Sequence, residues 1–232
     1  MASRIAKSPR RIQDDSQVFF QKVFGWMFLG LLVSAAASFL VVTNDSLILL
    51  IFGNRMVFYG LIIAELGMVF FLAFLIKRIS SQVAIVLFLL YSLSTGLTLS
   101  VIFFVFDLSS IVIIFFVAAA MFGIMSVYGY FTKTDLTTIG QFLIMALIGL
   151  VISALINMFL KNSTFDYIIS FAGVLIFTGL TAYDVQRIKK MSEEASDSDE
   201  NTTKIAIIGA LNLYLDFINL FLSLLELFGR RK

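Results

Sequence analysis

The chain alternates long apolar runs with short polar connections. Seven runs of about twenty residues or more contain few charged residues. At 1.5 Å per residue, each run is long enough to cross a hydrocarbon core about 30 Å thick. The pattern therefore predicts an all-α integral membrane protein with seven transmembrane helices, at 20–42, 56–76, 83–106, 108–131, 137–160, 165–188 and 205–228.

The polar segments are short, so these helices are expected to form one transmembrane domain over residues 20–228. A polar basic segment, 1–19, precedes it, and a basic tail, 229–232, follows it. The longest connection is 191–204, which is acidic and serine-rich and is predicted to be a mobile linker. The first apolar run is too long for a signal peptide, so we expect a retained helix.

Composition narrows the chemistry that this protein can perform. Hydrophobic residues make up 60% of the chain and the mean hydropathy is +1.00, whereas soluble domains are about 45–50% apolar. Cysteine and histidine are absent, which excludes disulfides, thiolate and imidazole metal sites, and histidine-based catalytic triads. The net charge of +2 does not indicate a nucleic-acid partner. Proton or cation chemistry must therefore use carboxylates, and we expect no bound cofactor.

The placement of lysine and arginine predicts the orientation in the membrane. Eleven of these residues fall on the side of the N-terminus and five on the opposite side, with Lys22, at the start of the first helix, not counted. Because positive residues concentrate on the cytoplasmic side, the N-terminus is predicted to be cytoplasmic. The tail Arg230-Arg231-Lys232 is an exception to this rule, because it places three positive residues on the side opposite the N-terminus. A last run that re-entered the membrane would remove this exception, but its length favours a full crossing.

Small residues recur every four positions in three of the predicted helices. Such stripes let helix backbones approach closely in lipid, so they predict a tightly packed bundle. They are Gly30, Ser34 and Ser38; Ser92, Gly96 and Ser100; and Gly149, Ser153 and Asn157.

The last predicted helix carries a stripe of polar residues. Their spacing of three and four places them on one face, and a polar stripe inside a membrane cannot face lipid. We therefore predict that this seventh helix lies at the centre of the bundle and lines a polar path. The stripe consists of Gly209, Asn212, Asp216, Asn219, Ser223 and Glu226.

Three carboxylates fall within apolar runs: Glu65, Asp184 and Asp216. A charge at the centre of a spanning helix costs at least about 2.5–3.5 kcal/mol, so each needs a partner or a purpose. For Glu65, a structural role in packing and a functional role are equally compatible with the sequence. Asp184 and Asp216, on consecutive helices, are candidates to share a proton and sense pH, to hold Ca²⁺, or to catalyse proteolysis. On straight helices Asp216 would lie about 10 Å deeper than Asp184.

Several segments resemble the transmembrane Bax inhibitor motif family. These are FFQKVFGWMFLGLLVSAAASF, LFLLYSLSTGLTLSVIF, IFTGLTAYDVQRIKKM and GALNLYLDFINLFLSLLELFG. The resemblance implies a seven-helix fold and a pH-sensitive calcium leak in which Asp184 and Asp216 form the sensor. It also implies a basic latch near the end of the second helix, for which Lys77 and Arg78 are candidates, and an acid at Glu65. The short N-terminal segment is similar to that of bacterial members, which favours a bacterial inner membrane.

The leading hypothesis is a pH-sensitive leak channel or exchanger for Ca²⁺ or other cations, with the bilayer, Ca²⁺ and protons as partners and no enzymatic activity. One alternative is a regulatory protein that binds a membrane protease or a cell-death factor without transport. An intramembrane aspartyl protease is disfavoured. Tyr183-Asp184 fits its first motif, but Leu213-Tyr214-Leu215-Asp216 departs from Gly-x-Gly-Asp, and its proline motif is missing because Pro9 is the only proline.

Overall fold

The computed structural model describes residues 9–194 and 199–232, without the side chains of residues 9–15, 73, 77, 193, 194 and 199. The described chain is helical, with one isolated antiparallel bridge, Phe106–Arg231, as its only extended pairing. Seven of its helices are long and apolar enough to span a membrane, which confirms the predicted fold class. The elements are α1 (Pro9–Val42), α2 (Asp45–Phe52), α3 (Arg55–Leu75), η1 (Ile76–Arg78), α4 (Ser81–Leu99), α5 (Ile102–Val105), α6 (Leu108–Phe131), α7 (Thr137–Leu160), α8 (Ser163–Glu194) and α9 (Asp199–Phe228).

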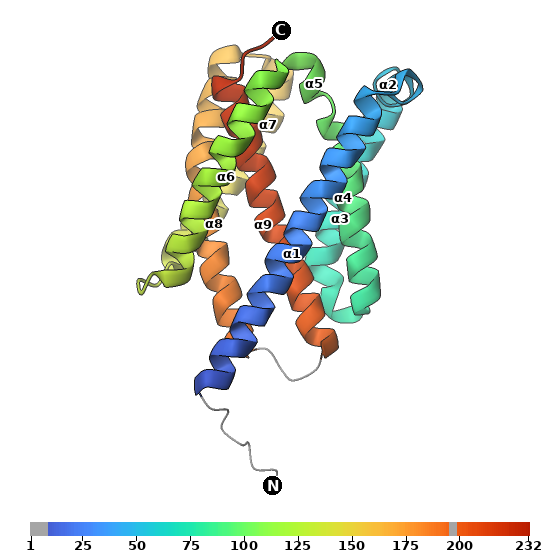
Figure 1. Ribbon diagram of the computed structural model, residues 1–232. Helices are drawn as coiled ribbons and strands as arrows, with labels where there is room; N and C mark the ends of the chain where they lie inside the picture. The colour runs from blue at the N-terminus through green and yellow to red at the C-terminus, as the bar shows by residue number, and fades with distance from the viewer. Residues whose placement is uncertain (1–8, 195–198) are drawn as a thin grey trace.

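Helix α9 passes through the middle of the bundle, as predicted for the seventh span (Figure 1). It packs against α1 and α4 on one side and against α6 and α8 on the other. In its span 67% of the residues are buried, compared with 6% in the spans of α3 and α7, which form the periphery. Aromatic contacts fill its interface with α6: the Phe217 ring packs edge-on against Phe115 and Phe122, with centroids 5.4 and 5.6 Å apart.

Two of the predicted small-residue stripes form the α1–α4 seam. Ser34 Oγ donates to Ser92 O and Ser38 Oγ donates to Gly96 O, each at 2.6 Å. A Cβ atom on Gly96 would collide with the Ser34 backbone. The stripe on α7 is different, because a Cβ on Gly149 would meet nothing within 4 Å, so the prediction of close packing there is wrong for this glycine.

The third predicted helix, 83–106, is broken in the structure. Helix α4 ends at Leu99, and the short α5 covers Ile102–Val105. Near the break Thr98 Oγ1 donates to Thr95 O at 3.0 Å, and Ser100 Oγ donates to Leu97 O at 2.6 Å. Such hydroxyls compete with the helical hydrogen bonds of the backbone, which explains why the helix ends here within an apolar run.

Other boundaries also differ from the predictions. A short helix, α2, joins the first two spans, and Asn44 Oδ1 caps it by accepting from the backbone N–H groups of Ser46 and Leu47. Helix α1 begins at Pro9 rather than residue 20, since proline is compatible with a first helical position.

The predicted mobile linker 191–204 is a further correction. Helix α8 continues to Glu194 and α9 begins at Asp199, so only 195–198 of this segment lie outside the described residues. An ion pair one turn apart, Lys204 Nζ to Glu200 Oε1 at 3.1 Å, stabilises the start of α9.

Candidate functional site

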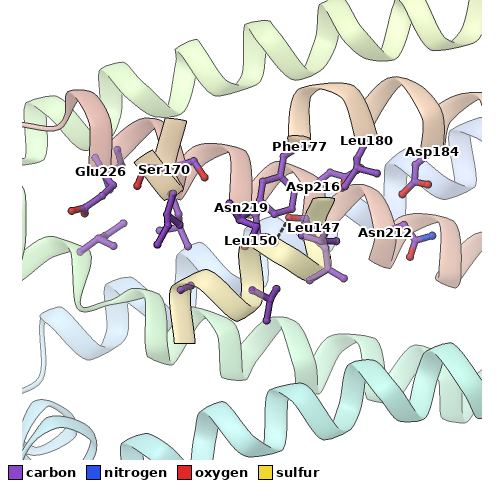
Figure 2. A pocket seen from close by; sticks show the side chains of 18 of the residues that line it. Leu147, Leu150, Ser170, Phe177, Leu180, Asp184, Asn212, Asp216, Asn219 and Glu226 are labelled. Atoms are coloured by element: carbon purple, nitrogen blue, oxygen red, sulfur yellow. Dashed lines mark hydrogen bonds between the residues drawn. The ribbon is translucent and has the colours of Figure 1, made fainter. Parts of the chain in front are cut away.

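The polar stripe of α9 lines a partly open cavity of about 870 Å³, whose wall includes exposed side chains such as Leu66 and Val151 (Figure 2). Helix α7 packs mainly on α8, and the cavity separates it from α9. Apolar side chains such as Leu147 and Leu150 of α7 form most of the wall. The polar lining residues are Ser170, Asp184, Arg187, Asn212, Asp216, Asn219, Ser223 and Glu226.

Five of the six predicted stripe residues face this cavity, all except Gly209. Gly209 lies against α8 and α1 instead, because a Cβ there would be 3.2 Å from Ile188 and 3.3 Å from Val23. A glycine at this position therefore serves close helix packing. The rest of the stripe gives the cavity a polar group on nearly every turn of α9.

Asp216 is the most deeply buried carboxylate in the cavity. It is 4% exposed, and its Oδ2 atom has no hydrogen-bond partner among the described residues. A buried acceptor without a partner is energetically costly, and such atoms are rare in folded proteins. A proton bound to this carboxyl group would reduce that cost, because the neutral form tolerates burial better than the charged form.

Asp184, on α8, lines the same cavity and is half-buried. Figure 2 shows Asp184 and Asn212 toward one end of the cavity, Glu226 at the other, and Asp216 and Asn219 between them. The structure thus brings the two predicted sensor residues to one cavity.

A second charge on α8 was not predicted as part of the site. Arg187 lies three residues after Asp184 and also lines the cavity. The spacing of three, which places two residues on one helical face, was the signal that could have identified it.

Sequence comparison shows the family. The family model described as "Inhibitor of apoptosis-promoting Bax1" (Bax1-I) matches residues 16–232, which include every spanning helix. The chain belongs to the Bax inhibitor family. The matched residues include those that line the cavity and the helices that surround it.

Relatives within the Bax inhibitor family are similar over nearly their whole length. The Escherichia coli inner membrane protein YbhL is 47% identical over 217 residues, 93% of each chain. A Borreliella burgdorferi protein is 48% identical over 214 residues, 92% of each chain. A Deinococcus radiodurans protein is 37% identical over 228 residues, 98% of this chain and 97% of its own. This Bax inhibitor family chain is accordingly an integral membrane protein.

Of the two latch candidates, only the side chain of Arg78 is described by the structure. Arg78 is in η1, its side chain is exposed, and it is not among the lining residues. The side chain of Lys77 lies outside the described residues. The basic side chain that lines the cavity with Asp184 is that of Arg187. In this structure Arg187 is therefore the basic residue best placed to act as a latch.

Glu65, where the Bax inhibitor resemblance implies an acid, faces α4, although the next residue, Leu66, lines the cavity. Its Oε1 atom accepts hydrogen bonds from Ser94 Oγ at 3.1 Å and from Thr98 Oγ1 at 3.0 Å. Both donors belong to α4, so the carboxyl group ties α3 to its neighbour. Glu65 does not line the cavity, and these contacts favour its structural role.

The carboxylates of the cavity do not form a dense metal cage. No group of three or more Asp, Glu, His or Cys residues that could hold a metal ion occurs among the described residues. Ca²⁺ usually takes six to eight oxygen ligands, so an ion beside Asp184 and Asp216 would keep part of its water shell. Such a site suits passage of an ion better than tight storage.

Proposed function

We propose that this protein is a pH-sensitive leak channel or exchanger for Ca²⁺ and similar cations, without enzymatic activity, in a bacterial inner membrane and with its N-terminus in the cytoplasm. The observation that carries the proposal is the buried carboxyl group of Asp216, which lines a membrane-embedded cavity together with Asp184 and whose Oδ2 atom has no hydrogen-bond partner among the described residues. Two carboxylates in one low-dielectric space interact strongly and titrate as a coupled pair.

The pair supports a simple gating mechanism. When Asp184 and Asp216 hold one proton between them, α8 and α9 pack without net repulsion. At higher pH the shared proton leaves and the two negative charges repel each other, which loosens α8 against α9. The other charged groups that line the cavity are Arg187 and Glu226. Arg187 then supplies a counter-charge on the same face of α8 as Asp184.

The cavity also supports the passage of a partly hydrated ion. A water molecule occupies about 30 Å³ in the liquid, so about 870 Å³ accommodates an ion with several waters. Beyond Asp216, the side chains of Asn219, Ser223 and Glu226 offer oxygen atoms toward the C-terminal end of α9. A cation that leaves Asp216 therefore meets another oxygen after each turn.

The test is Ca²⁺ flux into liposomes that contain only this protein, measured from about pH 5 to about pH 8. Because the chain has no histidine, the wild-type transition should depend on carboxyl groups. Asp184→Asn and Asp216→Asn should each abolish the pH dependence, since an amide cannot share the proton. The double variant should add little to either single variant, because both remove one coupled unit.

Two results would overturn the proposal. A pH transition that survives in the double variant excludes the aspartate pair as the sensor and directs attention to Glu65. No protein-dependent flux at any pH would favour the alternative of a regulatory interaction protein without transport.

A further inference from the structure

The C-terminal tail, Gly229–Lys232, folds back onto α5 and the residues that join α5 to α6. Asp107 N donates to Arg230 O at 2.9 Å, and Lys232 N donates to Val105 O at 3.0 Å. These bonds flank the Phe106–Arg231 bridge. Lys232 Nζ also donates to Phe103 O at 2.7 Å. The tail, which ends beside α5 in Figure 1, is thus held through its main chain and a side chain.

The segment beneath the tail is a wall of the cavity. Ile102, Val105 and Phe106 line the cavity from this segment, and Leu225 and Glu226 line it from α9. Gly229 lets the chain approach the Phe106 ring closely, because a Cβ at this position would collide with Leu225 O and lie 2.7 Å from that ring. The tail therefore lies against one end of the cavity.

Arg231 places a positive charge at that end. Its guanidinium pairs with the Glu226 carboxylate and lies 5.9 Å from the centroid of the Phe106 ring. The Glu226 side chain is 32% exposed and that of Arg231 is 62% exposed, so water reaches the pair. Glu226 follows Asp216 by ten residues, or about 15 Å along the helix, and is the last cavity carboxylate on α9.

We infer that Arg231 is a tethered cation that occupies Glu226 and closes the C-terminal end of the cavity, and that dissolved cations open this end by displacing it. The identity of the displacing ion, Ca²⁺, rests on the proposed function. A partly exposed ion pair is weak and is screened by salt, so an incoming divalent ion competes with it. The main-chain bonds to Val105 and Asp107 keep the displaced guanidinium nearby for re-closure.

The inference also accounts for an exception in the sequence. Arg230, Arg231 and Lys232 lie on the side where the distribution of positive charge predicts few such residues. Their contacts give them another role: Arg231 neutralises Glu226, and Lys232 binds the free carbonyl of Phe103. On this inference, the positive charge of the tail serves to close the cavity.

The absence of cysteine makes a direct accessibility experiment possible. Asn219→Cys places one thiol in the cavity, about two turns inside Glu226. The full-length protein is placed in lipid nanodiscs, and its modification rate is measured with a small cationic and a small anionic thiosulfonate. Addition of Arg231→Gln should raise both rates about fivefold, equivalent to ~1 kcal/mol. A purely electrostatic effect would raise the cationic rate and lower the anionic one.

Arg230→Gln is the matched control, because it removes the same charge from the adjacent residue. The Arg230 side chain is 84% exposed, and its Nε atom is 3.9 Å from the Asp107 carboxylate. Its rates should stay within about twofold of the parent. Equal acceleration by both arginine variants, or opposite responses of the two reagents to Arg231→Gln, would overturn the inference.

A second measurement tests the competing ion. Millimolar Ca²⁺ should speed labelling of the Asn219→Cys protein more than NaCl of equal ionic strength. Glu226→Gln should speed labelling by both reagents and abolish the specific effect of Ca²⁺. A Ca²⁺ effect that persists in Glu226→Gln contradicts the inference. Labelling needs no ion flux, so a failure of transport in every variant would count against the proposed function alone.

Discussion

The two sides of α9 handle polar groups in opposite ways. On the side of α1 and α4, the hydroxyls of Ser34 and Tyr214 are hydrogen-bonded at 2.7 Å, and Ser34 Oγ also donates to Ser92 O. On the side of α7 and α8, Asp216 lines a cavity, and its buried Oδ2 atom has no partner among the described residues. The hydrogen bonds of Ser34 and Tyr214 fix helix packing, whereas the open oxygen of Asp216 is the group that the proposed function uses. Thr95 Oγ1 on α4 is an exception, because it is buried without a partner among the described residues.

Close packing of the first side can be broken at Gly96. Gly96→Val should destabilise the protein by about 1–3 kcal/mol or more, because its side chain would collide with Ser34 and Ala37 across the α1–α4 seam. Gly149→Val on α7 is the control, since that position is open, and it should melt like wild type. The measurement is the melting temperature of the purified protein in detergent. A wild-type melting temperature for Gly96→Val would contradict the interpretation.

Replacement of Glu65 or of Asp216 by leucine should separate an effect on stability from an effect on function. Glu65→Leu removes the acceptor of Ser94 and Thr98 and should cost about 1–2 kcal/mol while the pH transition of ion flux remains. Asp216→Leu should leave the melting temperature unchanged or higher and abolish the transition, because it replaces an acceptor without a partner. If Glu65→Leu abolished the transition and left stability intact, the two roles would be assigned wrongly.

A smaller effect is expected from a single hydroxyl. Tyr214→Phe keeps the ring packed against Phe88 and Tyr91 but removes the hydrogen bond to Ser34. Stability should fall by about 1 kcal/mol, seen as a lower melting temperature, with the pH dependence of flux unchanged. Tyr167→Phe, on an exposed tyrosine, is the control, and an equal loss in both variants would argue against the hydrogen bond.

The smallest effect is expected at the connection between α6 and α7. Hydrogen bonds from Lys190 Nζ and from Thr137 hold the pKa of the exposed Asp135 carboxyl below its ordinary value. A carboxyl with a lowered pKa stabilises the fold above its unfolded pKa of about 3.9, and this contribution is lost as the pH falls through the folded value. Asp135→Asn should therefore lower the melting temperature slightly at neutral pH. The difference should shrink in strong acid, and a difference that grows there would contradict this account.

Prediction from sequence was strongest where one physical requirement acts along a whole helix. The charge-poor runs predicted the spans, and the spacing from Asn212 to Glu226 predicted the face of α9 that lines the cavity. The break after α4 was missed because it depends on where the Ser100 hydroxyl finds an acceptor. The linker at 191–204 was over-predicted from composition, because acidic and serine-rich residues at helix ends still continue the helical hydrogen bonds.

The positively charged residues of the site were harder to predict than its carboxylates. Asp184 and Asp216 stand out because charged residues are rare in apolar runs. Arg187 was counted with the basic residues that set orientation, although it lines the cavity. The partner of Glu226 could not be predicted, because Arg231 reaches it only after the chain turns at Gly229.

The α1–α4 seam also bears on biosynthesis. Ser34 and its acceptor in Ser92 are 58 residues apart, so at 5–20 residues per second α1 waits roughly 3–12 s in the bilayer for α4. During this time Ser34 Oγ can donate to Gly30 O within its own helix, at 3.0 Å, so its hydroxyl is satisfied while lipid surrounds it. The cavity carboxylates of α9 lack such a local partner, because the structure records no hydrogen-bond donor to them within the described part of their own helix. They are synthesised after the other spans, when the walls of their cavity are already in the membrane.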